Sequence, residues 1–386
     1  TNYQDSYIES IHPKPTNVTM DSDGNWLASY RLAPSQRITV QAKGTVLVGL
    51  MPKKMSLDQE QLKAYVQEQQ NWETSNKEVR TLAAQLKTPR AIYDYLVREF
   101  KYDYNRDFNA ISQARKGAVK PLQTKQGVCL EFTDAFIALA RAAGIPAREV
   151  DGYANTENSR QRPLSLVKDI LHAWPEYYDT EKQTWVMVDP TWGNTTGGVD
   201  YFDVLDFDHV AFVIRGYDSE YPVPAGGYKY DGDENLKDVN ISFPGSFVIP
   251  PVSISVEADE AVSHYSVLPL TSEFTVVNTG EGIVPAEKLA ISSNELSPSV
   301  QVHQLPSIPP FGHADVSAKF DPVSLLTKKT FPLTITIAGI TLSQSIRVTP
   351  LLFSVYTAIG GSFIALLAII IFVVAKKTRS VSISRS

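Results

Sequence analysis

Three residues of the types used in nucleophilic catalysis follow one another along the chain: Cys129, His172 and Asp189. Cys129 is the only cysteine of the chain. A thiol is mostly protonated at neutral pH, so a catalytic cysteine needs a histidine to take its proton. A carboxylate then fixes the imidazole tautomer and stabilises the imidazolium. These three residue types therefore predict acyl chemistry through a thioester.

The local sequence predicts the elements that would position these side chains. Apolar residues recur every three or four positions from 132 to 143, and Gly144 and Pro146 end this run, so a helix should begin near the cysteine. The free N–H groups at a helix N-terminus favour a thiolate and could hold a developing oxyanion. The histidine and the aspartate are expected on two antiparallel strands, 171–178 and 185–192, with the aspartate ending the second.

Four motifs follow one another along the chain: G-V-C at 127–129, A-R-A-A-G-I-P-A-R-E-V-D-G-Y at 140–153, H-A-W at 172–174 and W-V-M-V-D-P-T-W at 185–192. On these motifs the chain resembles the transglutaminase-like superfamily, and within it the membrane-anchored bacterial or archaeal type. The resemblance covers roughly residues 75–215 and implies a papain-like α+β fold. It implies Cys129 as nucleophile, His172 as base and Asp189 as orienter. Family members include cross-linking enzymes, proteases, amidases and inactive proteins, so the resemblance does not fix the reaction.

Aromatic residues near these motifs are candidate walls of a substrate cleft. Trp174 and Trp192 flank the base and the orienter, while Tyr102 and Tyr104 precede the cysteine. Similar family members carry aromatics at the latter place. Core packing is the competing interpretation for all four residues. The polar segment 106–125 is interpreted as a surface loop, with a substrate-binding flap as the alternative.

Acidic residues and a histidine between 193 and 216 raise the question of a metal site. Their spacing fits no metal-binding motif, so they are interpreted as turns that lead into a strand at 210–214. The histidine is a rival base, although His172 has the stronger motif around it. No metal or cofactor site is therefore expected. The residues weighed are Asp200, Asp203, Asp206, Asp208 and His209.

Composition indicates a globular protein of two or three domains: 386 residues, 43% hydrophobic and 20% charged. A net charge of −6 without a long basic block gives no support for nucleic-acid binding. One cysteine excludes an intramolecular disulfide. The expected parts are a β-rich N-terminal segment at 1–56, which could be an incomplete domain, a catalytic domain at 57–220, a linker at 221–239, a β-sandwich spacer at 240–346, a transmembrane helix at 350–375 and a cytoplasmic tail at 376–386.

Within the first segment, a strand at 38–42 is expected to end in a turn at Lys43-Gly44. Short apolar runs broken by Pro, Asn, Gly and Ser predict an immunoglobulin-like β-sandwich after the linker, with strands at 252–256, 274–277, 289–291, 300–302 and 333–337. Residues 351–375 carry no charge, and as a helix they would be about 37 Å long, enough to span a bilayer. A buried soluble helix is the alternative. The basic residues that follow place the tail in the cytoplasm and the catalytic domain outside, in a single-pass membrane protein.

The expected function is that of a membrane-anchored, extracytoplasmic cysteine enzyme that acts on amide or peptide bonds of protein or peptide substrates. Hydrolysis is slightly favoured over amine transfer, because the additional β-barrel domains and calcium sites of animal transglutaminases have no match here. A catalytically inactive binding or scaffold protein is the main alternative, since buried cysteines are common. A purely structural surface protein is a third interpretation. The oligomeric state and any sequence before Thr1 stay open.

Overall fold

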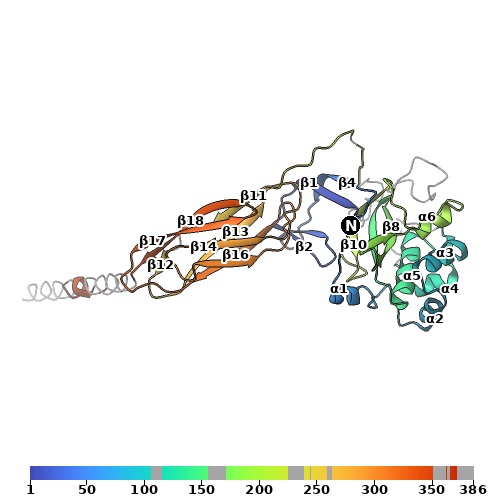
Figure 1. The fold of residues 1–386 in the computed structure, drawn as a ribbon, viewed down its shortest axis with the longest axis horizontal. Helices are drawn as coiled ribbons and strands as arrows, with labels where there is room; N and C mark the ends of the chain where they lie inside the picture. The colour runs from blue at the N-terminus through green and yellow to red at the C-terminus, as the bar shows by residue number, and fades with distance from the viewer. Residues whose placement is uncertain are drawn as a thin grey trace, which may run out of the picture. The chain divides into compact units, whose positions relative to one another are not determined.

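The protein folds into two compact units, each with its own core (Figure 1). The computed structural model describes residues 1–105, 115–154, 171–224, 239–243, 245–258, 263–350, 362 and 366–371. The first unit contains residues 1–13, 20–27 and 36–249. The second contains residues 14–19, 28–35 and 250–386.

A four-stranded antiparallel sheet with the order β10-β7-β8-β9 is the centre of the first unit. The antiparallel pairing of β8 with β9 confirms the predicted hairpin. The second strand, however, ends earlier than predicted, and Asp189 instead caps helix α6. Pro190 explains the difference, because proline has no N–H for a strand ladder and suits the first position of a helix. The strands are β7 (Ala147–Ala154), β8 (Leu171–Asp179), β9 (Thr184–Met187) and β10 (His209–Arg215).

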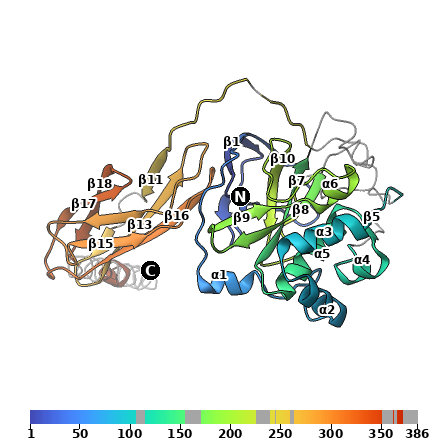
Figure 2. The ribbon, with the colours of Figure 1, turned by 45° about the vertical axis from the view of Figure 1, so that its right-hand side comes forward.

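Helix α5 (Cys129–Ala142) packs against β7 and β8, and α2, α3, α4 and α6 contact it in turn (Figure 2). The predicted helix at the cysteine is therefore confirmed, including its end, where Gly144 has a φ of +82°. Thr88 caps α3 by accepting a hydrogen bond from Ala91 N–H, which fixes the helix that precedes the cysteine segment. The other helices are α1 (Gln59–Ala64), α2 (Lys77–Leu86), α3 (Pro89–Glu99), α4 (Val119–Thr124) and α6 (Pro190–Thr195).

Short two-stranded sheets complete the first half of the chain. The predicted turn at Lys43-Gly44 is wrong, because both residues lie inside β4, which pairs with β1. A side chain at Gly44 would place its Cβ 2.2 Å from the carbonyl oxygen of Tyr7, so glycine serves the close approach of two strands. The strands are β1 (Gln4–His12), β2 (Asn17–Met20), β3 (Trp26–Ser29), β4 (Gln41–Val48), β5 (Lys101–Tyr102) and β6 (Gln126–Gly127).

Two sheets with a common apolar core form the second unit, as a sandwich requires. Their strand orders are β11-β13-β16 and β12-β18-β17-β14-β15. Alternation in the sequence anticipated five of these strands but missed β12, β16 and β18, and the immunoglobulin-like topology stays a prediction. The strands are β11 (Ile254–Ala258), β12 (Ser263–Tyr265), β13 (Leu270–Asn278), β14 (Lys288–Ser292), β15 (Val300–Gln304), β16 (His313–Phe320), β17 (Lys329–Ile337) and β18 (Ile340–Thr349).

Some sequence-based predictions fall mainly or partly outside the described residues. The predicted membrane span at 351–375 is largely among them, as is the first half of the polar segment 106–125. Searched over the described part of the chain, the structure contains no helix that combines the length and the apolarity needed to cross a membrane.

Candidate active site

Cys129 is the first residue of α5, at the helix end where backbone N–H groups lack intrahelical partners. The preceding residue, Val128, donates its N–H to Oε2 of Glu131 at 3.0 Å, which closes the first turn. Gly127 is required for this arrangement, because a Cβ there would lie 2.5 Å from Cβ of Glu131. Cys129 keeps 6% of its surface exposed, so its thiol is recessed but not completely sealed.

The structure brings the three predicted catalytic residues together. Nε2 of His172 lies 2.8 Å from Oδ2 of Asp189. The other ring nitrogen, Nδ1, makes no hydrogen bond of ordinary geometry with any described residue. Cys129 is nevertheless close enough to this imidazole to contribute to its pKa. Hydrogen bonds of unliganded catalytic sites are often loose, so this geometry fits a base that waits beside its nucleophile.

Electrostatics favour the charged forms of the His172–Asp189 pair. Burial lowers the pKa of His172, but the charge and hydrogen bond of Asp189, with a smaller contribution from Cys129, raise it to about 9 overall. Burial raises the pKa of Asp189, yet His172 and His209 together hold it below its usual value. At neutral pH the pair is therefore an imidazolium and a carboxylate.

Asp189 also has a structural role at the same position. Its Oδ1 accepts a hydrogen bond from Trp192 N–H at 2.9 Å and so caps α6. One carboxylate oxygen is thus committed to the backbone and the other to the imidazole. This division fixes the orientation of the carboxylate, as an orienting residue requires.

The four aromatic residues predicted to wall a cleft occupy different environments. Trp174 and Trp192 are buried, and their rings approach the His172 imidazole with a centroid separation of 5.9 Å each. Tyr102 is buried on β5, which pairs with the strand just before the cysteine, and its ring lies 4.9 Å from that of Tyr104. Tyr104 is 49% exposed. Among the four, Tyr104 alone offers substantial free surface, and a cleft role for any of them stays a prediction.

His209 has a place in this site that the sequence did not reveal. Its Nε2 lies 3.3 Å from Oδ2 of Asp189, the oxygen that His172 also contacts. Its Nδ1 lies 2.9 Å and 3.0 Å from the two carboxylate oxygens of Asp206. Asp206 also forms a turn, because it accepts hydrogen bonds from the backbone of Asp208 and His209. The only sequence signal was the three-residue spacing from aspartate to histidine.

Strand β7, which lies between β10 and β8, makes room for both imidazoles. In the strand pairing, Gly152 of β7 stands opposite His172 and Ala154 stands opposite His209. Paired residues share a face, and positions two apart on a strand share a face, so both histidines rise from one side of the sheet. A Cβ on Gly152 would lie 2.1 Å from the carbonyl oxygen of Val210 and 2.8 Å from the Trp174 indole. Small residues on β7 therefore allow the site to form.

The donor atoms of His172, Asp189 and His209 lie within 4.8 Å of one another, which is a geometry that could hold a metal ion. The separations of 2.8 Å and 3.3 Å between the ring nitrogens and the carboxylate oxygen are ordinary hydrogen-bond lengths. Both imidazoles hold their protons more tightly than usual, and metal binding would have to displace those protons. The arrangement thus favours proton transfer over metal binding.

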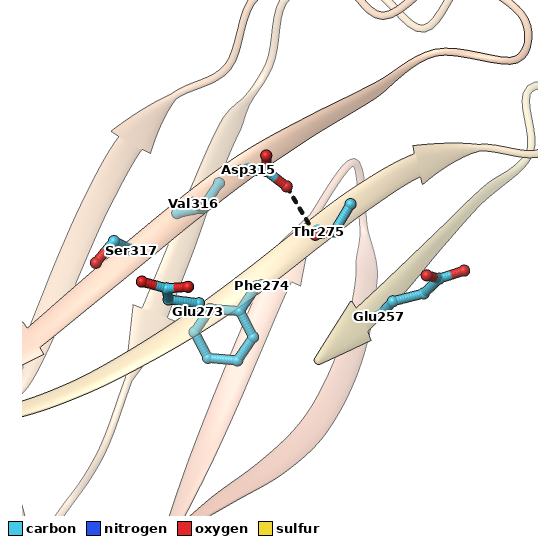
Figure 3. Close-up of a pocket in the computed structure, with 7 residues that line it drawn as sticks. All are labelled: Glu257, Glu273, Phe274, Thr275, Asp315, Val316 and Ser317. Carbon is cyan, nitrogen blue, oxygen red and sulfur yellow. Dashed lines mark hydrogen bonds between the residues drawn. The ribbon is translucent and has the colours of Figure 1, made fainter. Parts of the chain in front are cut away.

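A hollow on the second unit offers no competing site for acyl chemistry. It lies over β11, β13 and β16, and its acidic side chains are Glu257, Glu273 and Asp315 (Figure 3). Thr275 Oγ1 donates a hydrogen bond to Asp315 at 2.7 Å. Among the described residues that line this hollow there is neither a cysteine nor a histidine.

A nucleophilic cysteine at a helix N-terminus, with its base and orienter on an adjacent sheet, defines a cysteine acyl-transfer type of site. Residues 73–190 match the family described as the transglutaminase-like superfamily, which confirms the resemblance predicted from the motifs for this part of the chain.

Curated relatives match this region over short stretches. The chain is 40% identical over 78 residues to the uncharacterized protein YebA of Bacillus subtilis, and 43% identical over 70 residues to the protein-glutamine gamma-glutamyltransferase of Pseudomonas aeruginosa. These stretches cover 19% and 18% of this chain but only 10% of each relative.

Similar solved structures include a candidate cysteine protease from Cytophaga hutchinsonii, at 19% identity and a TM-score of 0.37 over 57% of this chain and 73% of that one. The transglutaminase of red sea bream has 13% identity and a TM-score of 0.28 over 82% and 68% of the two chains. TM-scores this low add no argument about function.

Proposed function

We propose that this protein is a membrane-anchored, extracytoplasmic cysteine enzyme that acts on amide or peptide bonds of protein or peptide substrates. One arrangement carries the proposal: Asp189 holds Nε2 of His172, and the second ring nitrogen is left for the sulfur of Cys129. The match of residues 73–190 to the transglutaminase-like superfamily supports the same class of chemistry.

In the proposed first half-reaction, Nδ1 of His172 already holds the proton of the Cys129 thiol, so a thiolate stands beside an imidazolium, and the thiolate attacks the amide carbon. The carbonyl oxygen becomes an oxyanion, which the N–H groups at the start of α5 stabilise. The C–N bond then breaks, His172 gives its proton to the leaving amine, and a thioester remains on the sulfur. Asp189 stays ionised throughout and stabilises the imidazolium.

The acyl acceptor decides the second half-reaction. Water, deprotonated by His172, releases a carboxylic acid, whereas a primary amine forms a new amide; either regenerates the thiol. Hydrolysis is slightly favoured, because no calcium site of animal transglutaminases can be matched to the residues of this sequence. The name of the Pseudomonas relative describes the transfer reaction, so amine transfer is the competing outcome.

Alkylation of the thiol tests the site without knowledge of the substrate. Iodoacetamide should label the native protein at Cys129, and since the chain has one cysteine, intact mass reports on this residue alone. Cys129→Ala should not be labelled, and His172→Ala should be labelled slowly while its circular dichroism spectrum is retained. Equal labelling rates for His172→Ala and the wild type would remove the main support for an enzyme.

Turnover distinguishes the two acceptors. The protein is incubated with a glutamine-containing peptide, with and without a primary amine, and mass spectrometry separates hydrolysis of the amide from incorporation of the amine. Neither product should form with Cys129→Ala. Amine incorporation at the expense of hydrolysis would reverse the preference stated above.

An inactive binding protein is the second candidate, and the burial of the site favours it. Cys129 is 6% exposed and His172 is 3% exposed in the described structure. This candidate predicts that the native thiol resists alkylation and becomes reactive only after unfolding. Rapid labelling of the native protein would exclude it.

The membrane location rests on the uncharged stretch 351–375 and on the basic residues that follow it. It predicts that the full chain fractionates with membranes and that protease added outside intact cells digests the catalytic domain. Recovery of the full chain free of membranes would contradict it.

A further inference from the structure

Four side chains of the first unit form a continuous hydrogen-bonded series: His172, Asp189, His209 and Asp206. Both nitrogens of His209 face carboxylate oxygens, and an ionised carboxylate can only accept. Both nitrogens must therefore carry hydrogen, so the geometry makes His209 an imidazolium. Burial lowers the pKa of His209, but the hydrogen bonds that it donates to both carboxylates raise it to about 9, in agreement with the protonated form.

We propose that His209 is a positioning residue for the catalytic pair: it holds Asp189 ionised and oriented, and Asp189 in turn holds His172. This inference rests on the proposed cysteine chemistry and adds a residue to its machinery. His209 contacts Oδ2 of Asp189, the oxygen that His172 also contacts, so it acts through the carboxylate.

The burial of Asp189 gives the physical reason. This carboxylate is completely buried, and a buried charge is costly unless hydrogen bonds and opposite charges compensate it. Trp192 N–H satisfies Oδ1, while Oδ2 has two lone pairs and receives one hydrogen bond from each imidazole. Without His209, one lone pair of Oδ2 loses its hydrogen-bond donor. The series as a whole is neutral, with two imidazoliums and two carboxylates.

The two imidazoliums also repel each other, because their ring centroids lie 5.8 Å apart. The carboxylate of Asp189 contacts both rings and offsets this repulsion. The described titratable groups that face His209 are Asp189 at the start of α6, Asp206 and Asp208 before β10, and His172 on β8. If His209 mainly supports Asp189, its removal should slow the alkylation of Cys129. If it mainly repels the His172 imidazolium, its removal should speed the alkylation, so an experiment can separate the two effects.

The test measures the rate of Cys129 alkylation by iodoacetamide as a function of pH in the full chain. His209→Phe removes both donors, His209→Gln keeps a donor without charge, and Asp206→Asn removes the anion while it keeps an oxygen for the turn. At about pH 6, His209→Phe should be labelled about tenfold more slowly than the wild type, the size expected for one charged hydrogen bond. At about pH 9.5, where the thiolate forms without help, the rates should converge.

His209→Gln should recover much of the rate at low pH, and Asp206→Asn should lie between it and His209→Phe. Asp203→Asn is the matched control, because Asp203 lies in the same loop but pairs with Lys182 at the surface. A merely structural role predicts instead a lower melting temperature with faster labelling of His209→Phe at every pH. That result, an unchanged profile, or faster labelling only at low pH would each overturn the inference.

The outcomes also separate this inference from the proposed function. If the wild-type thiol is reactive and His172→Ala slows it, the proposed function stands whatever His209→Phe does. If His172→Ala has no effect, the proposed function fails first. Should His209→Phe not fold, as judged by circular dichroism, Asp206→Asn carries the test alone, since its expected slower labelling at low pH has the same sign.

Discussion

Replacing Asp189 by asparagine is the most informative single change, because it alters the hydrogen-bonding capacity and the charge of the side chain but hardly its volume. The backbone contact leaves little freedom to the new amide. If its oxygen keeps accepting from Trp192 N–H, the NH₂ group must face Nε2 of His172. The imidazole then carries its hydrogen on Nδ1 and cannot accept the proton of Cys129. If the amide group rotates by 180°, its NH₂ group faces the N–H group of Trp192, so two donors meet at the start of α6 and the cap is lost.

The structure also gives the size of the effect. The pKa of His172 is about 9 against an ordinary 6.5, and Asp189 is the largest source of the increase. Loss of that increase removes ~3 kcal/mol of imidazolium stabilisation, at 1.36 kcal/mol for each pH unit. We therefore expect Asp189→Asn to lower turnover ~10²- to 10⁴-fold, where the larger value includes the wrong tautomer.

Iodoacetamide labelling followed by intact mass tests this expectation from about pH 5 to about pH 9.5. The wild type should react well below the pH at which free thiols react, and Asp189→Asn should react only near that pH. Asp58→Asn is the control, because Asp58 caps α1 through Gln61 N–H in the same unit. Coinciding profiles for Asp189→Asn and the wild type would refute the reasoning that Asp189 governs the site.

Three further predictions follow from other parts of the molecule. The pKa of His172 is raised, so its stabilising contribution is complete below about pH 6.5 and lost as pH rises through about 9. Its share of the stability lost in urea unfolding between pH 6 and pH 10 should be ~3 kcal/mol, and His172→Gln should remove that share, while His209, whose pKa is also raised to about 9, keeps its own. Gly127→Ala should cost about 1–3 kcal/mol and slow the alkylation of Cys129, because its new methyl group would collide with Glu131; an unchanged melting temperature and labelling rate would contradict this. Phe274→Ala should destabilise the second unit by about 3–5 kcal/mol in calorimetry and leave alkylation unchanged, because Phe274 is buried in a separate core; slower alkylation would contradict it.

The sequence predicted the elements with strong local signals. The helix at Cys129 followed from apolar periodicity and a terminal glycine, and the hairpin that carries His172 followed from two apolar runs around a polar connection. These features depend on neighbouring residues, which is why they can be read along the chain. Asp189 was placed on a strand, although the proline that follows it is better suited to the start of a helix.

Features that depend on distant residues were missed. Gly44 looked like a turn residue, but a neighbouring strand passes too close for a side chain, and only the pairing of β1 with β4 shows this. His209 looked like a rival of His172, because the chain order does not show that β7 separates their strands and brings both to one carboxylate. Such positions are set by strand order, which the residue pattern alone leaves undetermined.

The lack of a side chain at Gly152 shows how activity could be lost without any change to a catalytic residue. A single methyl group at that position would collide with the carbonyl oxygen of Val210 and with the indole of Trp174. Strands β8 and β10, which supply the imidazoles, would have to move away from β7, although Cys129, His172 and Asp189 would all be unchanged. The reaction therefore depends on the lack of a side chain at Gly152. A variant with all of its catalytic residues intact could still be inactive because a methyl group at this position displaces the strands that carry the imidazoles.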